Sequence, residues 1–391
     1  MTGNTAPRSG HPPLQTVSTG IVVAIVGFFS SFPILLQGVA AMGATPDQAA
    51  SALMTAAVAM GVTGAGLSLW KRQPISVAWS TPGSALLAVN AMPQGGFAEA
   101  VGAFLVAGLL VAVAGFWRPL GRLTAMIPGP IAQSMLAGVL LSLCIKPFQA
   151  LAISPAHALP VIAAWFLVGR VNRLFAVPAA VLAATAVTIW AAGFQIPAPP
   201  SVLTAPVWVS PQFSIPATLS IALPLFIVTM ATQNIPGIAV MRSYGYQPDS
   251  RPLFTTVGAA SMASAPFGAP ATCLAAITAA MCANPDCHPD PKQRYWSAVV
   301  CGLFYTLFGL FAGIITSFAG LAPTGLLGTL AGVALLGVFA GSAHAALEDP
   351  EYREAAAITF AVTASGVTIL GLSGAVWGLI AGAIVVIAKR R

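Results

Sequence analysis

The stretch SIPATLSIALPLFIVTMATQNIPGIAVM, residues 214–241, decides the fold because it contains no charged side chain. It closes a run of 68 uncharged residues between Arg173 and Arg242. Only 6% of the whole chain is charged and the mean hydropathy is +0.88, whereas soluble domains carry about a quarter charged residues. Most of the chain must therefore be solvated by lipid. Further charge-free runs cover 9–46, 123–145, 252–285, 295–347 and 355–388.

These apolar runs predict an all-α polytopic membrane protein. A bilayer core of about 30 Å takes roughly 20 apolar residues per helix, and its backbone must be satisfied within helices or a closed barrel. Continuous rather than alternating apolar runs exclude the barrel. Run lengths and Gly/Pro positions predict 14 spans, with an uncharged Pro-rich stretch at 195–215 after the seventh. The predicted spans are 16–42, 47–69, 74–92, 98–117, 124–145, 157–169, 175–194, 216–241, 252–264, 266–283, 294–318, 323–346, 352–370 and 373–388.

The distribution of positive charge supports this layout. Lys and Arg are enriched in cytoplasmic loops, and a cytoplasmic N-terminus puts 15 of the 16 cations inside and only Lys146 outside. We therefore predict a bacterial inner-membrane protein with both termini cytoplasmic. The cations are scattered at span ends, so the net charge of +7 does not indicate a nucleic-acid partner. Residues 1–15 are predicted to be a disordered tail.

The two halves of the chain, 16–200 and 201–391, resemble each other. Residues 38–42 (GVAAM) match 237–241 (GIAVM), and 79–89 (WSTPGSALLAV) match 267–277 (FGAPATCLAAI). An odd number of spans per repeat inverts the second copy, as in alternating-access transporters. We predict two inverted seven-span repeats whose third and tenth segments are broken into a short strand and a half-helix.

The broken segments are the predicted substrate site. Pro82 and Pro270 suit a first helical turn, so two half-helices would direct N–H groups and positive dipole ends at the midplane, where an anion can bind. The alternative is that these prolines only kink ordinary helices. The small residues that would let a ligand reach the backbone are Gly83 and Ser84, after Thr81, and Ala271 and Thr272.

Polar side chains in the first and eighth spans extend this site. Ser31 and Gln37 lie in the first span, and Gln233 and Asn234 lie in the eighth. An amide inside an apolar helix is costly unless it is hydrogen-bonded, so these amides either contact substrate or tie the helix to a neighbour. Aromatic walls are available from Phe28, Phe29, Phe32 and Phe267.

Titratable groups are scarce at membrane depth. All nine acids fall at predicted span ends or loops, which leaves His344 as the candidate proton-linked group; the alternative is a packed or interfacial histidine. Cys282, Cys287 and His288 lack a fourth ligand, so no metal or cofactor is predicted. An enzyme would need a nucleophile–base pair at membrane depth, and a channel would need charged or carbonyl-rich rings.

The strings Trp79-Ser-Thr-Pro-Gly-Ser-Ala-Leu86 and Thr232-Gln-Asn-Ile-Pro-Gly-Ile-Ala239 resemble the benzoate:proton symporter (BenE) family. Nucleobase permeases and sulfate-permease-like anion transporters are its wider relatives. The resemblance covers the chain after about residue 14. It implies a core domain (16–117 plus 216–318), a gate domain (124–194 plus 323–388), and substrate between the half-helices, facing span 8. Nucleobase relatives carry a glutamate where this chain has Gln233-Asn234, which fits an anionic substrate and leaves the proton-coupling residue unassigned.

The resemblance implies import of an aromatic carboxylate, most simply benzoate, together with a proton by alternating access. A nucleobase or inorganic-anion transporter on the same fold is the alternative, and an ion channel is less favoured. Homodimer formation is left open by the sequence.

Overall fold

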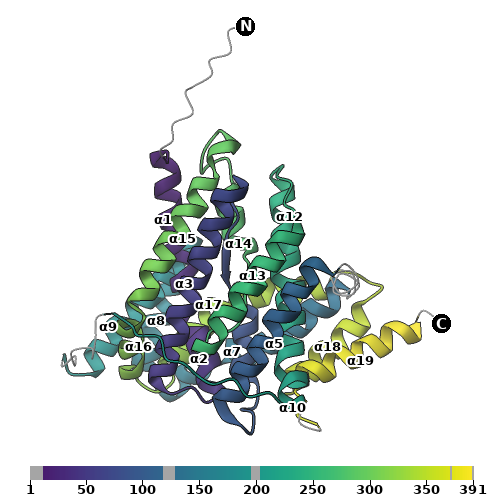
Figure 1. The fold of residues 1–391 in the computed structure, drawn as a ribbon. Helices are drawn as coiled ribbons and strands as arrows, with labels where there is room; N and C mark the ends of the chain where they lie inside the picture. Colours follow the sequence, from purple (N-terminus) through teal and green to yellow (C-terminus); the bar gives the residue numbers. More distant parts are fainter. Residues whose placement is uncertain (1–11, 118–127, 195–202, 370–371, 390–391) are drawn as a thin grey trace.

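The computed structural model describes residues 12–117, 128–194, 203–369 and 372–389, which are mainly helical (Figure 1). The first part contains α1 (Leu14–Phe29), α2 (Phe32–Ala41), α3 (Pro46–Lys71), β1 (Val77–Trp79), α4 (Thr81–Val89), α5 (Gly96–Phe116), α7 (Gly129–Ile153), α8 (Pro155–Val171), η1 (Arg173–Phe175) and α9 (Ala176–Ala191). The second part contains α10 (Ile215–Ala217), η2 (Thr218–Ala222), α11 (Leu223–Thr229), η3 (Met230–Asn234), α12 (Ile235–Ser243), α13 (Ser250–Ser264), η4 (Ala265–Phe267), β2 (Thr272–Leu274), α14 (Ala276–Ala283), η5 (Pro291–Gln293), α15 (Tyr295–Leu310), α16 (Ala312–Leu321), α17 (Leu326–Leu347), α18 (Arg353–Ala364) and α19 (Gly374–Lys389).

The helices confirm a multi-pass helical membrane protein. Among the described residues, seven helices are long and apolar enough to cross a membrane. An eighth forms if the pair Pro291–Leu310 and Ala312–Leu321, bent by 57°, counts as one span. Helices α8 and α19 are apolar but shorter, and α4 and α14 are half-length. The predicted tail is shorter than expected because α1 begins at Leu14; residues 1–11 lie outside the described part of the chain.

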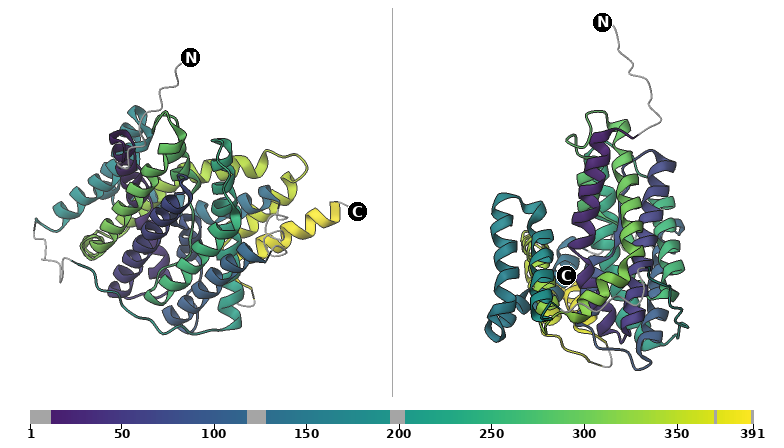
Figure 2. Two further views of the ribbon diagram at one scale, coloured as in Figure 1. Left: turned by 45° about the horizontal axis from the view of Figure 1, so that its top comes forward. Right: turned by 90° about the vertical axis from the view of Figure 1, so that its left-hand side faces the viewer.

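The outward faces of the helices are apolar, as lipid contact requires. The side chains of Leu167, Leu182 and Ile384 are 63%, 72% and 61% exposed. Helices α8 and α9 lie side by side at one edge of the molecule, and α9 also contacts α1 of the tall bundle that contains α1, α3 and α15 (Figure 2). Exposed leucine and isoleucine side chains on this scale are stable only where lipid replaces water.

Two short strands pair at the centre of the fold. β1 pairs with β2 in antiparallel register, with Val77 opposite Leu274 and Trp79 opposite Thr272. Each strand leads directly into a short helix, α4 or α14, so the prediction of a strand and half-helix at both places is confirmed. Because the strands run in opposite directions, the two helices leave the strand pair in opposite directions.

The predicted register between the two broken segments is wrong. The second half-helix begins at Ala276 and not after Pro270, which lies in extended chain before β2. As the last residue of its strand, Trp79 is therefore equivalent in the repeat to Leu274, the last residue of β2. It is not equivalent to Phe267, which ends η4. Small and apolar residues are so frequent here that several registers match by composition, and only the strand pairing selects one.

Small residues bring the helices together, as is usual where lipid removes the hydrophobic driving force between spans. Gly61 of α3 and Gly302 of α15 face each other so closely that a Cβ on either would collide with the carbonyl oxygen of the other. A Cβ on Gly258 of α13 would likewise meet the backbone of Ala112 in α5. These contacts hold the half-helices inside a tightly packed bundle.

The segment after residue 202 crosses the end of the bundle opposite the N-terminus in extended form (Figure 1). The backbone N–H of Val209 donates to Pro266 O at 2.8 Å, and that of Gln212 donates to Ala98 O at 3.0 Å. The carboxylate of Glu99, which is 8% exposed, accepts hydrogen bonds from Gly95 N and from the hydroxyl of Ser214. This buried acid fixes the connection between the halves of the chain.

Candidate functional site

The N-terminus of α4 is capped and anchored. Ser80 is the N-cap residue, and its Oγ accepts from Gly83 N at 3.1 Å. The hydroxyl of Thr229 in α11 donates to the same Oγ at 2.8 Å. The N–H of Ser80 donates to Ala271 O at 2.8 Å, beside β2. Thr81, the first helical residue, is partly exposed, so its backbone N–H lies at the accessible start of this helix.

The N-terminus of α14 is, by contrast, uncapped. Ala275 is the N-cap residue, is 6% exposed and has no side chain that can accept from the first turn. The N–H groups of Ala276 and Ile277 have no acceptor within the helix, as in any first turn. Ile277 is nevertheless 66% exposed. This combination of free amides and a positive dipole end favours binding of an anion.

The structure places Ala271 and Thr272 before the second half-helix rather than in its first turn. The N–H of Thr272 donates to Ser261 Oγ at 2.8 Å, so that amide is already occupied, and Ala271 O is bonded to Ser80. Both residues precede α14 rather than open it. The first-turn amides of the second half-helix are those of Ala276 and Ile277, because the helix starts later than the proline predicts.

Gly83 and Ser84 are in the predicted half-helix but are fully packed. A Cβ on Gly83 would collide with the side chain of Leu225 in α11, so the missing side chain serves helix packing. The hydroxyls of Ser84 and Thr272 are buried and have no hydrogen-bond partner among the described residues. Buried hydroxyls without a partner are rare in folded proteins. They mark either a site that a ligand can fill or a group whose burial destabilises the fold.

The π-helical turn η3 separates the roles of the two adjacent amides in span 8. Asn234 is 0% exposed; its Oδ1 accepts from Leu274 N at 2.8 Å and its Nδ2 donates to Met230 Sδ at 3.2 Å. Gln233 is partly exposed and its side chain has no partner among the described residues. Asn234 therefore ties span 8 to β2, while the Gln233 amide is free to meet a ligand. π-turns of this kind are common at functional sites.

We expect Asn234→Leu to destabilise the protein by about 1–3 kcal/mol, because the buried N–H of Leu274 would lose its acceptor. Thermal unfolding in detergent measures this change. Gln233→Leu is the matched control and should leave the melting temperature nearly unchanged. Equal melting temperatures for the two variants would contradict the assignment of Asn234 as the structural amide.

Aromatic side chains gather where span 1 breaks. Between α1 and α2, the hydroxyl of Ser31 donates to Gly27 O at 2.8 Å, so this serine serves the break itself. The ring of Phe28 lies 5.4 Å from that of Trp79 in β1. Phe29 and Phe32 line an apolar cavity of about 160 Å³ with residues of α9, α16 and α17. Phe267 lies against Trp208 instead, outside this cluster.

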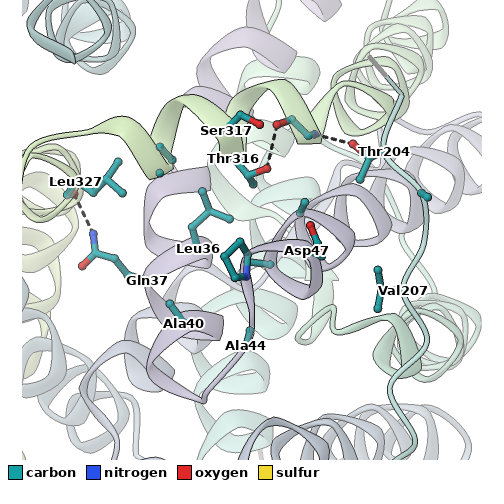
Figure 3. A pocket seen from close by; sticks show the side chains of 17 residues that line it. Leu36, Gln37, Ala40, Ala44, Asp47, Thr204, Val207, Thr316, Ser317 and Leu327 are labelled. Carbon is teal, nitrogen blue, oxygen red and sulfur yellow. Dashed lines mark hydrogen bonds between the residues drawn. The ribbon is translucent and has the colours of Figure 1, made fainter. Parts of the chain in front are cut away.

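The side chain of Gln37 bonds to α17 and α7. Its Nε2 donates to Leu327 O of α17 at 2.9 Å, and its Oε1 accepts from Lys146 Nζ of α7 at 3.3 Å. It lines a cavity of about 670 Å³ bounded by α2, α3, α16 and the chain near Thr204 (Figure 3). Lys146 was predicted to lie in an outer loop, but α7 continues to Ile153 and places it inside a helix. Its isolation among apolar residues was the signal available in the sequence.

His344 does not join the site. Its side chain is 77% exposed, and Nε2 lies 3.9 Å from the Oε2 of Glu348, one turn later on α17. An exposed side chain does not fit the packed alternative. No cluster of three or more His, Cys, Asp or Glu side chains able to hold a metal occurs in the described segments.

The chain is similar to membrane transport proteins along nearly its full length. The family model described as benzoate membrane transport protein matches residues 11–387. The inner membrane protein YdcO of Escherichia coli (strain K12) is 38% identical over 95% of this chain and 95% of its own length. The benzoate membrane transport protein of Acinetobacter baylyi (strain ATCC 33305 / BD413 / ADP1) is 30% identical over 94% of this chain and 93% of its own.

Solved structures share the fold. The transmembrane domain of the cyanobacterial bicarbonate transporter BicA superposes with a TM-score of 0.61 at 18% identity, covering 95% of this chain and 97% of that one. SLC26A9 gives 0.62 at 12% identity, covering 96% and 65%. The family-model match and the relative from A. baylyi place the chain, a membrane transporter and not an enzyme, in the BenE benzoate membrane transport family.

Proposed function

We propose that the protein imports benzoate, or a closely related aromatic carboxylate, together with a proton by alternating access. The observation that carries this proposal is the uncapped N-terminus of α14, which presents free amides beside the strand pair and an exposed Ile277. An anion satisfies such amides and the helix dipole together. The relative from A. baylyi is named as a benzoate transport protein, which supports the choice of anion.

The carboxylate is proposed to bind the first-turn amides of α14 and the N–H of Thr81 in α4, with the Gln233 amide as the side-chain donor. The ring is proposed to lie toward Phe29 and Phe32, which already border an apolar cavity. Ser31, Gly83, Ser84, Ala271 and Thr272 then shape the strand pair and the helix starts. With no carboxylate of the protein among these residues, the bound carboxylate itself is proposed to be the group that takes up the proton.

The same proposal includes the architecture that such transport needs. Two inverted seven-span repeats, 16–200 and 201–391, would make a core domain (16–117 plus 216–318) that moves against a gate domain (124–194 plus 323–388), with both termini cytoplasmic. An inverted repeat produces an antiparallel strand pair from which the two half-helices extend in opposite directions, as β1 and β2 do with α4 and α14. Accessibility of single cysteines at each terminus to a membrane-impermeant reagent tests the orientation.

Uptake of labelled benzoate into proteoliposomes tests the function. We expect saturable uptake, stimulated by an inside-alkaline pH gradient, above the level in protein-free vesicles, which report passive entry of benzoic acid. Competition by unlabelled uracil or sulfate distinguishes the nucleobase and inorganic-anion alternatives. Uptake no greater than in empty vesicles, with folded protein, would exclude benzoate as the substrate.

We expect Gln233→Ala to raise the KM for benzoate about tenfold, because a hydrogen bond to a charged group contributes roughly 1.5–3 kcal/mol. Gln233→Glu should abolish uptake by repelling the carboxylate. The melting temperature should stay within experimental error for both, since this side chain has no partner among the described residues. An unchanged KM in Gln233→Ala would remove Gln233 from the site.

A further inference from the structure

Lys146 is a cation inside the helical body of the protein without a carboxylate partner. In the described residues the ion pairs are His344 with Glu348 and Lys389 with Glu354, all of them with exposed side chains. Lys146 is half-buried within α7. Ionisable side chains within membrane-spanning segments are costly and are usually functional, and an unpaired one calls for a counter-charge that the described protein does not supply.

The surroundings of Lys146 hold its side chain in place while leaving donors free. Its Nζ donates to Gln37 Oε1 at 3.3 Å, and the other end of that amide donates to Leu327 O at 2.9 Å. Gly328 of α17 leaves room for the lysine stem: a Cβ there would lie 3.3 Å from Lys146 Cδ. An ammonium group has three N–H donors, and Gln37 uses one of them.

Gln37 connects this lysine with the 670 Å³ cavity, whose wall it forms (Figure 3). Most of the other lining residues are small, and they include Thr204, Thr316 and Ser317. Asp47 is the charged residue that lines the cavity, and it is exposed, so water screens its effect on an entering anion. The half-buried ammonium of Lys146 is screened less. It therefore dominates the electrostatic potential at the part of the cavity wall that Gln37 forms.

We propose that Lys146 is a specificity-determining residue that forms, with Gln37, an entry site for a small organic carboxylate in the wall of this cavity. The carboxylate replaces the Gln37 carbonyl as the partner of the ammonium, and the bond between two charged groups is the stronger of the two. The Gln37 amide then remains as a second donor to the anion. The substrate class rests on the proposed transport of benzoate.

Kinetics of labelled benzoate uptake in Lys146 variants test this entry site. We expect Lys146→Gln to raise KM at least about tenfold with little change in Vmax, and Lys146→Arg to restore KM to within about threefold of wild type. Gln37→Glu, which would neutralise the ammonium in place, should raise KM as Lys146→Gln does. Lys71→Gln is the charge-matched control, since Lys71 lies at the end of α3 over the ring of Trp70, and should leave KM unchanged.

Other results would overturn the proposal. If Lys146 only ties α2 to α7 and α17, Gln37→Glu should strengthen that tie and raise the melting temperature without raising KM, and Lys146→Gln should lower Vmax or stability alone. Sulfate and uracil as labelled substrates separate this inference from the proposed function. If the wild type takes up sulfate but not benzoate, the benzoate proposal is refuted. The KM values of the same variants for sulfate then test the role of Lys146. Uptake of uracil and of no anion would overturn both.

Discussion

Replacing Ile277 by aspartate is expected to reduce benzoate uptake to below about 1% of the wild-type rate. The new carboxylate would lie at the second residue of α14, where it can accept from the free first-turn amides and repel a second anion. Juxtaposed like charges cost several kcal/mol, and each 1.4 kcal/mol is a factor of ten. Initial rates in proteoliposomes with matched protein content measure the loss.

The substitution should not unfold the protein, which is what makes it informative. Ile277 is 66% exposed, so little packing is lost, and an acidic residue near a helix N-terminus is stabilising. Ile277→Asn is the neutral control of nearly equal size and should change KM by only a few fold. If Ile277→Asp transports benzoate at a normal rate, the carboxylate does not bind at this helix end.

Replacing Gly61 by leucine is expected to prevent formation of a stable folded protein. A Cβ at this position would collide with the backbone carbonyl of Gly302 and lie 2.9 Å from the backbone N of Thr306. Backbone atoms cannot rotate out of the way as a side chain end can, so α3 and α15 would have to separate. We place the cost at about 4 kcal/mol or more, at the upper end of single substitutions. Size-exclusion profiles and melting temperature in detergent measure it.

Gly66→Leu is the matched control on the same helix. An added Cβ at Gly66 meets nothing within 4 Å among the described residues, and the position is exposed. Because the helix-propensity change and the added hydrophobicity are the same, this variant should fold as well as wild type. If both variants behaved alike, close contact of α3 with α15 would not be what holds this part of the bundle.

The predicted start of a half-helix differs from the observed start where contacts between residues distant in sequence decide it. Pro82 lies in the first turn of α4 as expected, because the preference of proline for a first helical turn is local. Pro270 has the same local preference but precedes a strand, since pairing with β1 fixes residues 272–274 as extended. Ala271 and Thr272 therefore precede the second half-helix instead of opening it. The sequence also places Lys146 in a loop, because counting uncharged residues ends the predicted span at residue 145, whereas α7 continues to Ile153.

Composition and pattern by themselves determined that this is a helical membrane protein with two broken segments, because lipid solvation and backbone hydrogen bonding act on every residue regardless of its partners. The strings around Thr81 and Gln233 also identified its family. Only the tertiary structure decided which of two adjacent amides is free, which helix end is uncapped and where a lone lysine points. Those properties depend on what residues distant in sequence, such as Leu274 for Asn234 and Gln37 for Lys146, place opposite each group.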